Sequence, residues 1–160
     1  IIGIGGLGQF AAGMALIDGC EVHAVDISPE ARKLAQEMGV QYVYENVSDL
    51  APAKCDVIVD YAGFGQTTTD ALEAVNDGGK VVVVGMGKLE ATISTRSLIL
   101  KQAQVIGSCG GTAEDIKAVY DYFATGKLKP LLHTITFDEI PEGLERLKRG
   151  EVKGRLVAVI

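Results

Sequence analysis

Closely spaced glycines at the start of the chain constrain its fold more than any other feature. They stand in the segment Gly3-Ile4-Gly5-Gly6-Leu7-Gly8, after the apolar pair Ile1-Ile2 and before a segment with helical periodicity, Gln9–Ile17. At this spacing the first glycine permits a tight turn off a strand, and the last permits a helix to pack closely on the sheet. The segment therefore predicts a strand, a glycine loop and a helix, in that order.

An acidic residue follows the second predicted strand. The run Glu21–Val25 predicts a second strand, and Asp26 follows it directly, 18 residues after Gly8. In dinucleotide-binding units an acid about 20 residues beyond the glycines accepts hydrogen bonds from the adenosine ribose, and the pyrophosphate lies at the helix N-terminus. We therefore expect Asp26 to bind the ribose and the amides near Gly6 and Leu7 to bind the pyrophosphate, with Gly5 leaving room for its approach.

The residues around Asp26 favour NAD over NADP. A carboxylate at this position repels a 2′-phosphate, and neither Ile27 nor Ser28 supplies an arginine that would bind one. The nearby cations, Arg32 and Lys33, fall inside the next predicted helix. The sequence thus predicts a nicotinamide cofactor, NAD.

Short β-branched runs alternate with amphipathic segments along the whole chain. This alternation is typical of a parallel sheet covered by helices on both faces, so we predict an α/β fold, a Rossmann-type doubly wound parallel sheet in three layers. The predicted strands are Ile1–Ile4, Glu21–Val25, Tyr42–Tyr44, Val57–Val59, Val81–Val84 (expected to be the most buried), Val105-Ile106, Thr134–Phe137 and Leu156–Ile160. Three of the predicted helical segments are Gln9–Ile17, Thr67–Val75 and a single turn near Leu98. Three more helices are predicted from their N-terminal caps: one from Ser28 to about Met38, one from Thr112 (with Asp115) to about Ala124, and one from Asp138 to Gly150. The segment Ser48–Cys55 is predicted to be a connection.

Composition narrows the class further. With 160 residues, 48% of them hydrophobic, residues 1–160 suffice for a single dinucleotide-binding domain, since domains often have about 100–150 residues. A net charge of −6 argues against nucleic-acid binding, and the absence of any apolar stretch near 20 residues predicts a soluble cytoplasmic protein. Cys20, Cys55 and Cys109 are widely separated and are expected to be reduced and buried. Because only two residues precede Gly3, we expect the chain to be a piece of a larger protein.

The predicted strands end in small residues that suit a ligand crevice. Three segments, Tyr61-Ala62-Gly63, Gly85-Met86-Gly87 and Gly107–Gly111, follow predicted strands, and ligands of open α/β sheets bind outside the carboxyl ends of the strands. The polar residues near these strand exits give weaker evidence for a functional site. His23 is expected to be a structural histidine and His133 to have no ligand role, while Asp60 is read as a turn former that could also contact a ligand. No catalytic triad can be assembled from the chain.

These motifs in this order resemble the cofactor domain of medium-chain dehydrogenases, especially the zinc-dependent alcohol dehydrogenases. The resemblance rests on the glycine loop, Val25-Asp26-Ile27-Ser28, Asp56–Asp60, Gly78–Gly85, Val105–Ser108, Gly111-Thr112 and the ending Gly150–Val157. It implies a two-domain enzyme whose upstream half binds a zinc ion that polarises an alcohol or carbonyl oxygen while hydride passes to or from the nicotinamide.

The resemblance also implies roles for residues that pattern alone does not assign. Backbone groups at Val84 and at Ser108, Cys109 and Gly110 would face the nicotinamide amide, in the crevice that the strand exits at Ala62 and Gly85 are already expected to line. Met86 would lie near the substrate pocket, and Arg155 would reach the pyrophosphate. The part from about residue 133 to 160 would dock on the upstream half, and two copies would pair through an edge strand near Leu89–Ser94.

One departure and two alternatives accompany this resemblance. The family often has a lysine five positions after the ribose-binding acid, where this chain has Ala31, so part of the adenosine contact is lost or moves to Arg32. A zinc-free quinone or enoyl reductase would share the fold, but such enzymes tend to use NADP and an Ala-x-x-Gly-x-x-Gly loop. An NAD-sensing regulatory module would have a similar loop and length, without the segments Gly107–Thr112 and Gly154–Val157.

Overall fold

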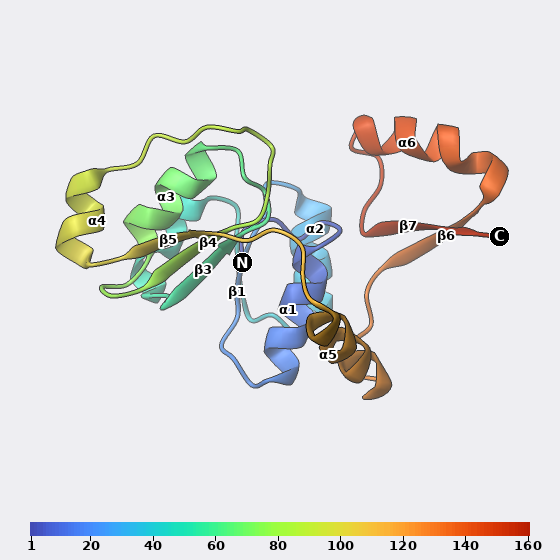
Figure 1. Ribbon diagram of the computed structural model, residues 1–160, viewed down its shortest axis with the longest axis horizontal. Coiled ribbons are helices and arrows are strands. Elements are labelled where there is room, and N and C mark those ends of the chain that lie inside the picture. Colours follow the sequence, from blue (N-terminus) through green and yellow to red (C-terminus); the bar gives the residue numbers. More distant parts are fainter.

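A computed structural model describes residues 1–160 and shows helices and parallel strands alternating along the chain (Figure 1). In chain order the elements are α1 (Gly8–Ile17), β1 (His23–Val25), α2 (Pro29–Glu37), β2 (Tyr42–Tyr44), the 3₁₀ helix η1 (Val47–Ala53), β3 (Val57–Asp60), α3 (Gln66–Ala74), β4 (Lys80–Val83), α4 (Thr95–Lys101), β5 (Gln104–Gly107), α5 (Ala113–Ala124), β6 (Leu132–Thr136), the 3₁₀ helix η2 (Phe137–Glu139), α6 (Ile140–Lys148) and β7 (Arg155–Val159). The α/β class predicted from the sequence is confirmed.

The main sheet is joined at its centre by the residues before the glycine loop. Strands β1 and β2 pair in parallel, as do β3, β4 and β5 in that order. Ile2 forms parallel bridges to both Val25 and Asp60, so it connects the two sets. The predicted strand Ile1–Ile4 is thus present only as this bridge, and the order β2, β1, Ile2, β3, β4, β5 reverses direction beside the glycine loop.

Helices cover both faces of this sheet, and alternating residues supply a core on each face. Ile2 and Val25 belong to one apolar cluster, together with buried residues of η1 and α3. Ile4 and Ala24 belong to a second cluster with residues of α1 and α2. Because successive side chains of a strand point to opposite faces, neighbouring residues at the centre of the sheet, such as Ala24 and Val25, contribute to different clusters. The three predicted layers are therefore present.

Helix α5 extends the second layer beside α1. The rings of Phe10 and Phe123 meet edge to face with centroids 6.1 Å apart, and the Tyr122 hydroxyl donates to a carboxylate oxygen of Asp18 at 2.6 Å. The predicted capping box is confirmed, since the Thr112 hydroxyl accepts from the Asp115 amide and the Asp115 carboxylate accepts from the Thr112 amide. This amide lowers the pKa of Asp115.

Several local predictions are wrong. Residues 48–55, expected as a connection, lie largely in η1, which buries Leu50. Strand β1 is buried throughout, whereas β4 is only partly buried, because β1 is covered on one face by α1 and α2 and on the other by η1 and α3. The helix predicted to begin at Asp138 is preceded by η2, whose cap is Thr136.

The predicted edge strand near Leu89–Ser94 is also absent. Residues 84–94 form a loop, and the outer strand of the sheet on this side is β5. The prediction of three buried cysteines fails as well: all three are free thiols, but Cys20 and Cys109 are exposed and Cys55 is half-buried. Residues 89–94 lie in the connection between β4 and α4, Cys20 lies in the turn between α1 and β1, and Cys109 lies in the loop after β5.

The C-terminal residues form a small second sheet of their own. Strands β6 and β7 pair in parallel and are connected through α6. In Figure 1 this unit lies apart from the main sheet, at the end of the segment that follows α5. It exposes large apolar side chains, including Phe137, Leu144 and Val159. No helix of the chain is both long and apolar enough to cross a bilayer.

Candidate dinucleotide-binding site

The glycine loop has the geometry that the sequence predicts. Gly3 has a φ of +85°, which a residue with a side chain rarely adopts, and it turns the chain off the central bridge. Gly8 lies so close to the carbonyl oxygen of Gly3 that an added Cβ would stand 1.8 Å from it. The amides of Gly6 and Leu7 donate no hydrogen bond within the chain. Free amides at the positive end of α1 form an anion-binding position.

Asp26 links the end of β1 to this loop. Its Oδ2 atom accepts from the amide of Ile4 at 2.7 Å, and its Oδ1 atom accepts from the amide of Ser28 at 2.8 Å. Each carboxylate oxygen can accept a further bond, because an ionised carboxylate has about four acceptor sites. The carboxylate is thus held beside the loop with capacity for two ribose hydroxyls.

Arg32 lies beside Asp26 but is already engaged. Its Nη1 atom donates to the carbonyl oxygens of Asp26 and Ile27 at 2.8 and 3.0 Å, and its Nη2 atom lies 3.1 Å from a carboxylate oxygen of Glu45. Glu45 was not singled out from the sequence, because its partner becomes apparent only when β2 lies beside β1. Because the Arg32 guanidinium is already bonded to Glu45 and to two carbonyl oxygens, it is not available to bind a 2′-phosphate, which favours a ligand that lacks one.

A cavity of about 330 Å³ opens at this point of the sheet. It lies at the carboxyl ends of β1 and β3, where ligands of open α/β sheets bind. Its walls come from five places: the glycine loop, the end of β1, the residues after β2, the turn after β3, and the start of α3. The lining residues include Gly3, Asp26, Ile27, Asn46, Ala62, Phe64, Thr67 and Asp70. Of these, Asn46, Phe64, Thr67 and Asp70 were missed, because their sequence context is that of ordinary loop and helix residues.

The three predicted strand exits do lie together. Gly63 and Gly85 are in such close contact that a Cβ on Gly63 would be 1.9 Å from the Gly85 carbonyl oxygen. The amide of Ser108 donates to the carbonyl of Val83 at 3.0 Å, which joins the loop after β5 to the end of β4. Met86, Ser108, Cys109 and Gly110 are exposed there, while Val84 is half-buried. These residues form an open edge beyond the cavity.

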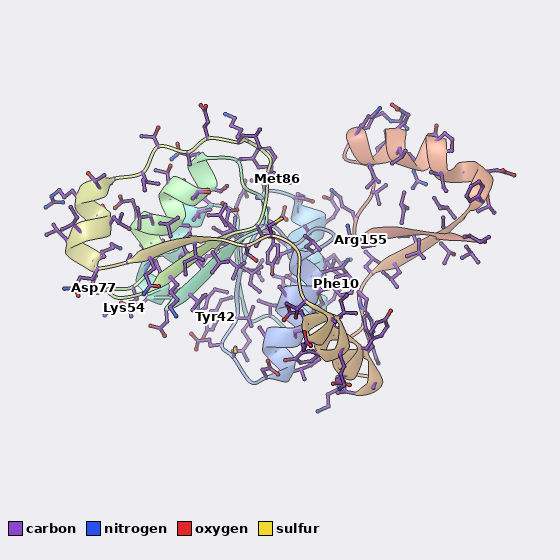
Figure 2. The ribbon with its side chains drawn as sticks, viewed as in Figure 1. Phe10, Tyr42, Lys54, Asp77, Met86 and Arg155 are labelled. Carbon is purple, nitrogen blue, oxygen red and sulfur yellow. The ribbon has the colours of Figure 1, made fainter.

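Arg155 lies against the glycine loop although it is far away in the sequence. A methyl group added at Gly6 would be 3.0 Å from its Cδ atom and 3.1 Å from its Nη1 atom. Figure 2 shows Arg155 at the end of β7 nearest the main body. A guanidinium at this place adds a positive charge to the free amides of the loop.

Asp60 has a structural role. It is fully buried, and its carboxylate accepts from the amides of Ala62 and Gly63 and from the hydroxyls of Thr67 and Thr68, at 2.8–3.0 Å. These bonds shape the turn after β3 that borders the cavity. The turn-former interpretation is therefore confirmed.

His23 fits its prediction as a structural histidine. His23 is buried, its Nδ1 atom lies 3.1 Å from the Tyr44 hydroxyl, its Nε2 atom lies 2.9 Å from Glu21, and its ring stacks on Tyr42. His133 is exposed on β6. No group of three or more His, Cys, Asp or Glu side chains is arranged to hold a metal ion, so the residues of this chain do not form a zinc site.

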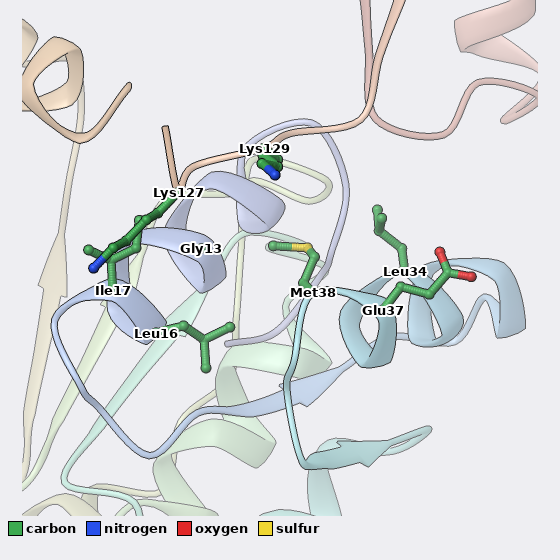
Figure 3. Close-up of a pocket in the computed structure, with 8 residues that line it drawn as sticks. All are labelled: Gly13, Leu16, Ile17, Leu34, Glu37, Met38, Lys127 and Lys129. Atoms are coloured by element: carbon green, nitrogen blue, oxygen red, sulfur yellow. The ribbon is translucent and has the colours of Figure 1, made fainter. Parts of the chain in front are cut away.

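A second cavity, of about 460 Å³, lies away from the loop (Figure 3). It is bounded by the last turns of α1 and α2 and by the segment after α5, with Leu16, Met38 and Lys129 among its lining residues. The C-terminal ends of these helices are at the opposite edge of the sheet from the glycine loop. This cavity is therefore separate from the dinucleotide site.

Together, the doubly wound sheet, the free loop amides and Asp26 define a dinucleotide-binding domain of the Rossmann type. The sequence profile of the zinc-binding dehydrogenases matches residues 6–125. The chain belongs to this zinc-binding dehydrogenase family.

Individual relatives agree with this assignment. The chain is 35% identical to an alcohol dehydrogenase of Geobacillus stearothermophilus, in an alignment covering 98% of this chain and 48% of the relative. Acetophenone reductase from Geotrichum candidum, solved in complex with NAD, is 33% identical with a TM-score of 0.92, covering 99% of this chain and 47% of the reductase. An alcohol dehydrogenase from Aeropyrum pernix is 28% identical with a TM-score of 0.90, covering 100% of this chain and 49% of that enzyme. The chain thus spans about half the length of these relatives.

Proposed function

We propose that this chain is the NAD(H)-binding part of an alcohol dehydrogenase. The observation that carries the proposal is the position of Asp26, which is bonded to the glycine loop and lines the adjacent cavity. An acid there accepts ribose hydroxyls and repels a 2′-phosphate, which favours NAD over NADP. The NAD complex of acetophenone reductase supports the same cofactor.

The residues of this chain would bind and orient the cofactor. Asp26 would accept from the adenosine ribose inside the cavity, and the amides of Gly6 and Leu7 would donate to the pyrophosphate, with Arg155 adding its charge. Gly5 has open space around it, which leaves room for the phosphates. A bound nicotinamide accepts or returns a hydride, and this is the chemistry that the cofactor supplies.

The exposed loop edge would hold the nicotinamide end. The backbone at Val84 and at Ser108, Cys109 and Gly110 would face the carboxamide, with Ala62 and Gly85 beside it and Met86 toward the substrate. These residues meet at one edge through the contacts between Gly63 and Gly85 and between Ser108 and Val83. Fixing the ring there would determine which face is presented for hydride transfer.

The substrate would be a small alcohol, aldehyde or ketone, and the zinc ion would belong to a part of the protein outside this chain. The names of the alcohol dehydrogenase and acetophenone reductase relatives support this substrate class. The exposed apolar side chains of α6 and β7 support docking of residues 133–160 on that further part. On this proposal the chain alone binds cofactor without turnover.

The natural protein would be a homo-oligomer that pairs through β5 rather than through Leu89–Ser94. Strand β5 is the outer strand of the main sheet and exposes Val105 and Ile106. An unpaired, apolar edge strand readily pairs with another chain. The cytoplasmic location expected from the sequence stays a prediction.

Two measurements on the natural protein test the proposal. Calorimetric titration should give tighter binding of NAD than of NADP, and elemental mass spectrometry should give stoichiometric zinc together with NAD-dependent oxidation of alcohols. Equal or tighter NADP binding would overturn the cofactor assignment. NAD binding without zinc would point to a zinc-free reductase, or to a sensor if no reductase activity were present.

A further inference from the structure

Gln9 connects two parts of the chain that are far apart in sequence. It is the second residue of α1, directly after the glycine loop, and it is fully buried. Its Oε1 atom accepts from the amide of Leu131 at 2.6 Å, and its Nε2 atom donates to the Leu131 carbonyl at 3.3 Å. One side chain thus satisfies both backbone groups of a residue that immediately precedes β6.

The carbonyl of Leu131 continues this connection to β7. It also accepts from the amide of Arg155 at 3.1 Å. Gly154 packs against the same oxygen so closely that an added Cβ would be 2.2 Å away, and its φ of +77° suits glycine. Arg155, the first residue of β7, and Gln9 therefore both bond to the backbone of the same residue, Leu131, which fixes how far apart they lie.

The side chain of Arg155 then returns to the loop from which Gln9 starts. As described above, its Cδ and Nη1 atoms pack beside Gly6. The contacts Gln9 to Leu131, Leu131 to Arg155 and Arg155 to Gly6 form a closed ring around the start of α1. We propose that Gln9 is a positioning residue, which holds Arg155 against the glycine loop and so sets the strength of pyrophosphate binding.

The ring of contacts matters because few other contacts hold the unit of β6, α6 and β7 to the main sheet. The unit of β6, α6 and β7 lies apart from the main sheet, and Arg155 is at its near end (Figures 1 and 2). Close by, Leu128 is buried, and its Cδ1 atom would be 2.7 Å from a Cβ on Gly13. Leu128 anchors the connecting segment to α1 by apolar contact, but it carries no directional bond to β7. The orientation of Arg155 therefore depends on the polar clamp at Gln9.

The inference rests on the proposed cofactor function and makes a different prediction from it. Replacing Gln9 by leucine keeps a similar volume and removes both hydrogen bonds to Leu131. Arg155 would then lose its fixed place, and NADH should bind about tenfold more weakly, as expected for the loss of a charge-assisted contact. Adenosine has no pyrophosphate, so its affinity should change less than twofold.

The test is a double-mutant cycle in the natural protein, with NADH affinity measured by fluorescence titration and adenosine affinity by displacement of NADH. The variants are Gln9→Leu, Arg155→Ala and the double variant, with Gln36→Leu on the exposed face of α2 as the matched control. If Gln9 acts through Arg155, the double variant binds NADH no more weakly than Arg155→Ala alone. The control should leave both affinities unchanged.

Each outcome of the cycle decides one question. Additive losses, or equal losses for NADH and adenosine, would overturn the positioning role of Gln9. An unchanged NADH affinity in Arg155→Ala would instead contradict the pyrophosphate contact in the proposed function. If Gln9→Leu does not fold, Gln9→Asn replaces it, because the shorter amide keeps the buried polarity but cannot span to both groups of Leu131.

Discussion

The carboxylate of Asp26 and the backbone amide of Ile4 are joined by a hydrogen bond of 2.7 Å. This bond ties the end of β1 to the glycine loop, 22 residues earlier in the chain. The acid that would bind the ribose and the loop that would bind the pyrophosphate are thus fixed relative to each other before any ligand arrives. Such preorganisation reduces the ordering cost of binding.

Asp26→Ala should weaken NAD binding and narrow the preference for NAD over NADP. The variant removes the ribose acceptor, the negative charge and the bond to Ile4, so we expect NAD to bind at least about tenfold more weakly. Calorimetry with both cofactors measures the effect. Asp77→Ala, at an exposed position far from the loop (Figure 2), is the control. Unchanged NAD affinity and preference in Asp26→Ala would contradict the ribose assignment.

Alanine at Gly5 and at Gly8 should have different effects. A Cβ at Gly8 would stand 1.8 Å from the Gly3 carbonyl oxygen, so Gly8→Ala should lower the free energy of unfolding by about 2–3 kcal/mol. At Gly5 nothing lies within 4 Å of an added Cβ, so Gly5→Ala should fold normally and yet bind NADH more weakly. Thermal melts and NADH titrations separate the two effects. A normal NADH affinity in Gly5→Ala would show that the phosphates do not approach this glycine.

Asp60→Ala should destabilise the fold strongly. It leaves the amides of Ala62 and Gly63 and the hydroxyls of Thr67 and Thr68 without their acceptor, in a buried turn. We expect a loss of at least about 3 kcal/mol in the free energy of unfolding, measured by urea denaturation. Asp60→Asn keeps one acceptor oxygen and should lose less. A loss below about 1 kcal/mol for Asp60→Ala would refute the structural role.

The three cysteines should react with iodoacetamide in a defined order. Burial raises the pKa of the Cys55 thiol, so at a given pH less of it is thiolate and it should react more slowly than the exposed Cys20 and Cys109. NADH should slow the alkylation of Cys109, which is in the predicted nicotinamide loop, and leave Cys20 unaffected as an internal control. Peptide mapping by mass spectrometry gives the three rates. Equal protection of Cys20 and Cys109 would argue against a local contact.

Val105→Pro should dissociate the proposed homo-oligomer. The amides of Gln104 and Ser108 donate to residues of β4 or just before it, so the alternating amides at Val105 and Gly107 point away from β4. Proline at 105 removes an outward donor and leaves the pairing with β4 intact. Light scattering after size exclusion should show a smaller species for this variant. An unchanged mass would place the interface elsewhere.

Much of the fold was predictable because its signals are local. The glycine loop, the alternation of β-branched and amphipathic segments, and the caps at Ser28 and Thr112 each depend on residues a few positions apart. The wrong predictions concern features that depend on distant neighbours. The residues Leu89–Ser94 have no strand partner, and Cys20 and Cys109 are left uncovered, which no local pattern reveals.

The sequence by itself determined the class of fold, the glycine loop and the acid at Asp26, since backbone sterics and helix and strand periodicity act over short distances. Only the tertiary structure decided which side chains surround the loop. Glu45 meets Arg32 because β2 pairs with β1, and Arg155 reaches Gly6 because Gln9 holds Leu131 from 122 residues away. Contacts of this kind form only when packing brings distant segments together, so no local sequence pattern reveals them.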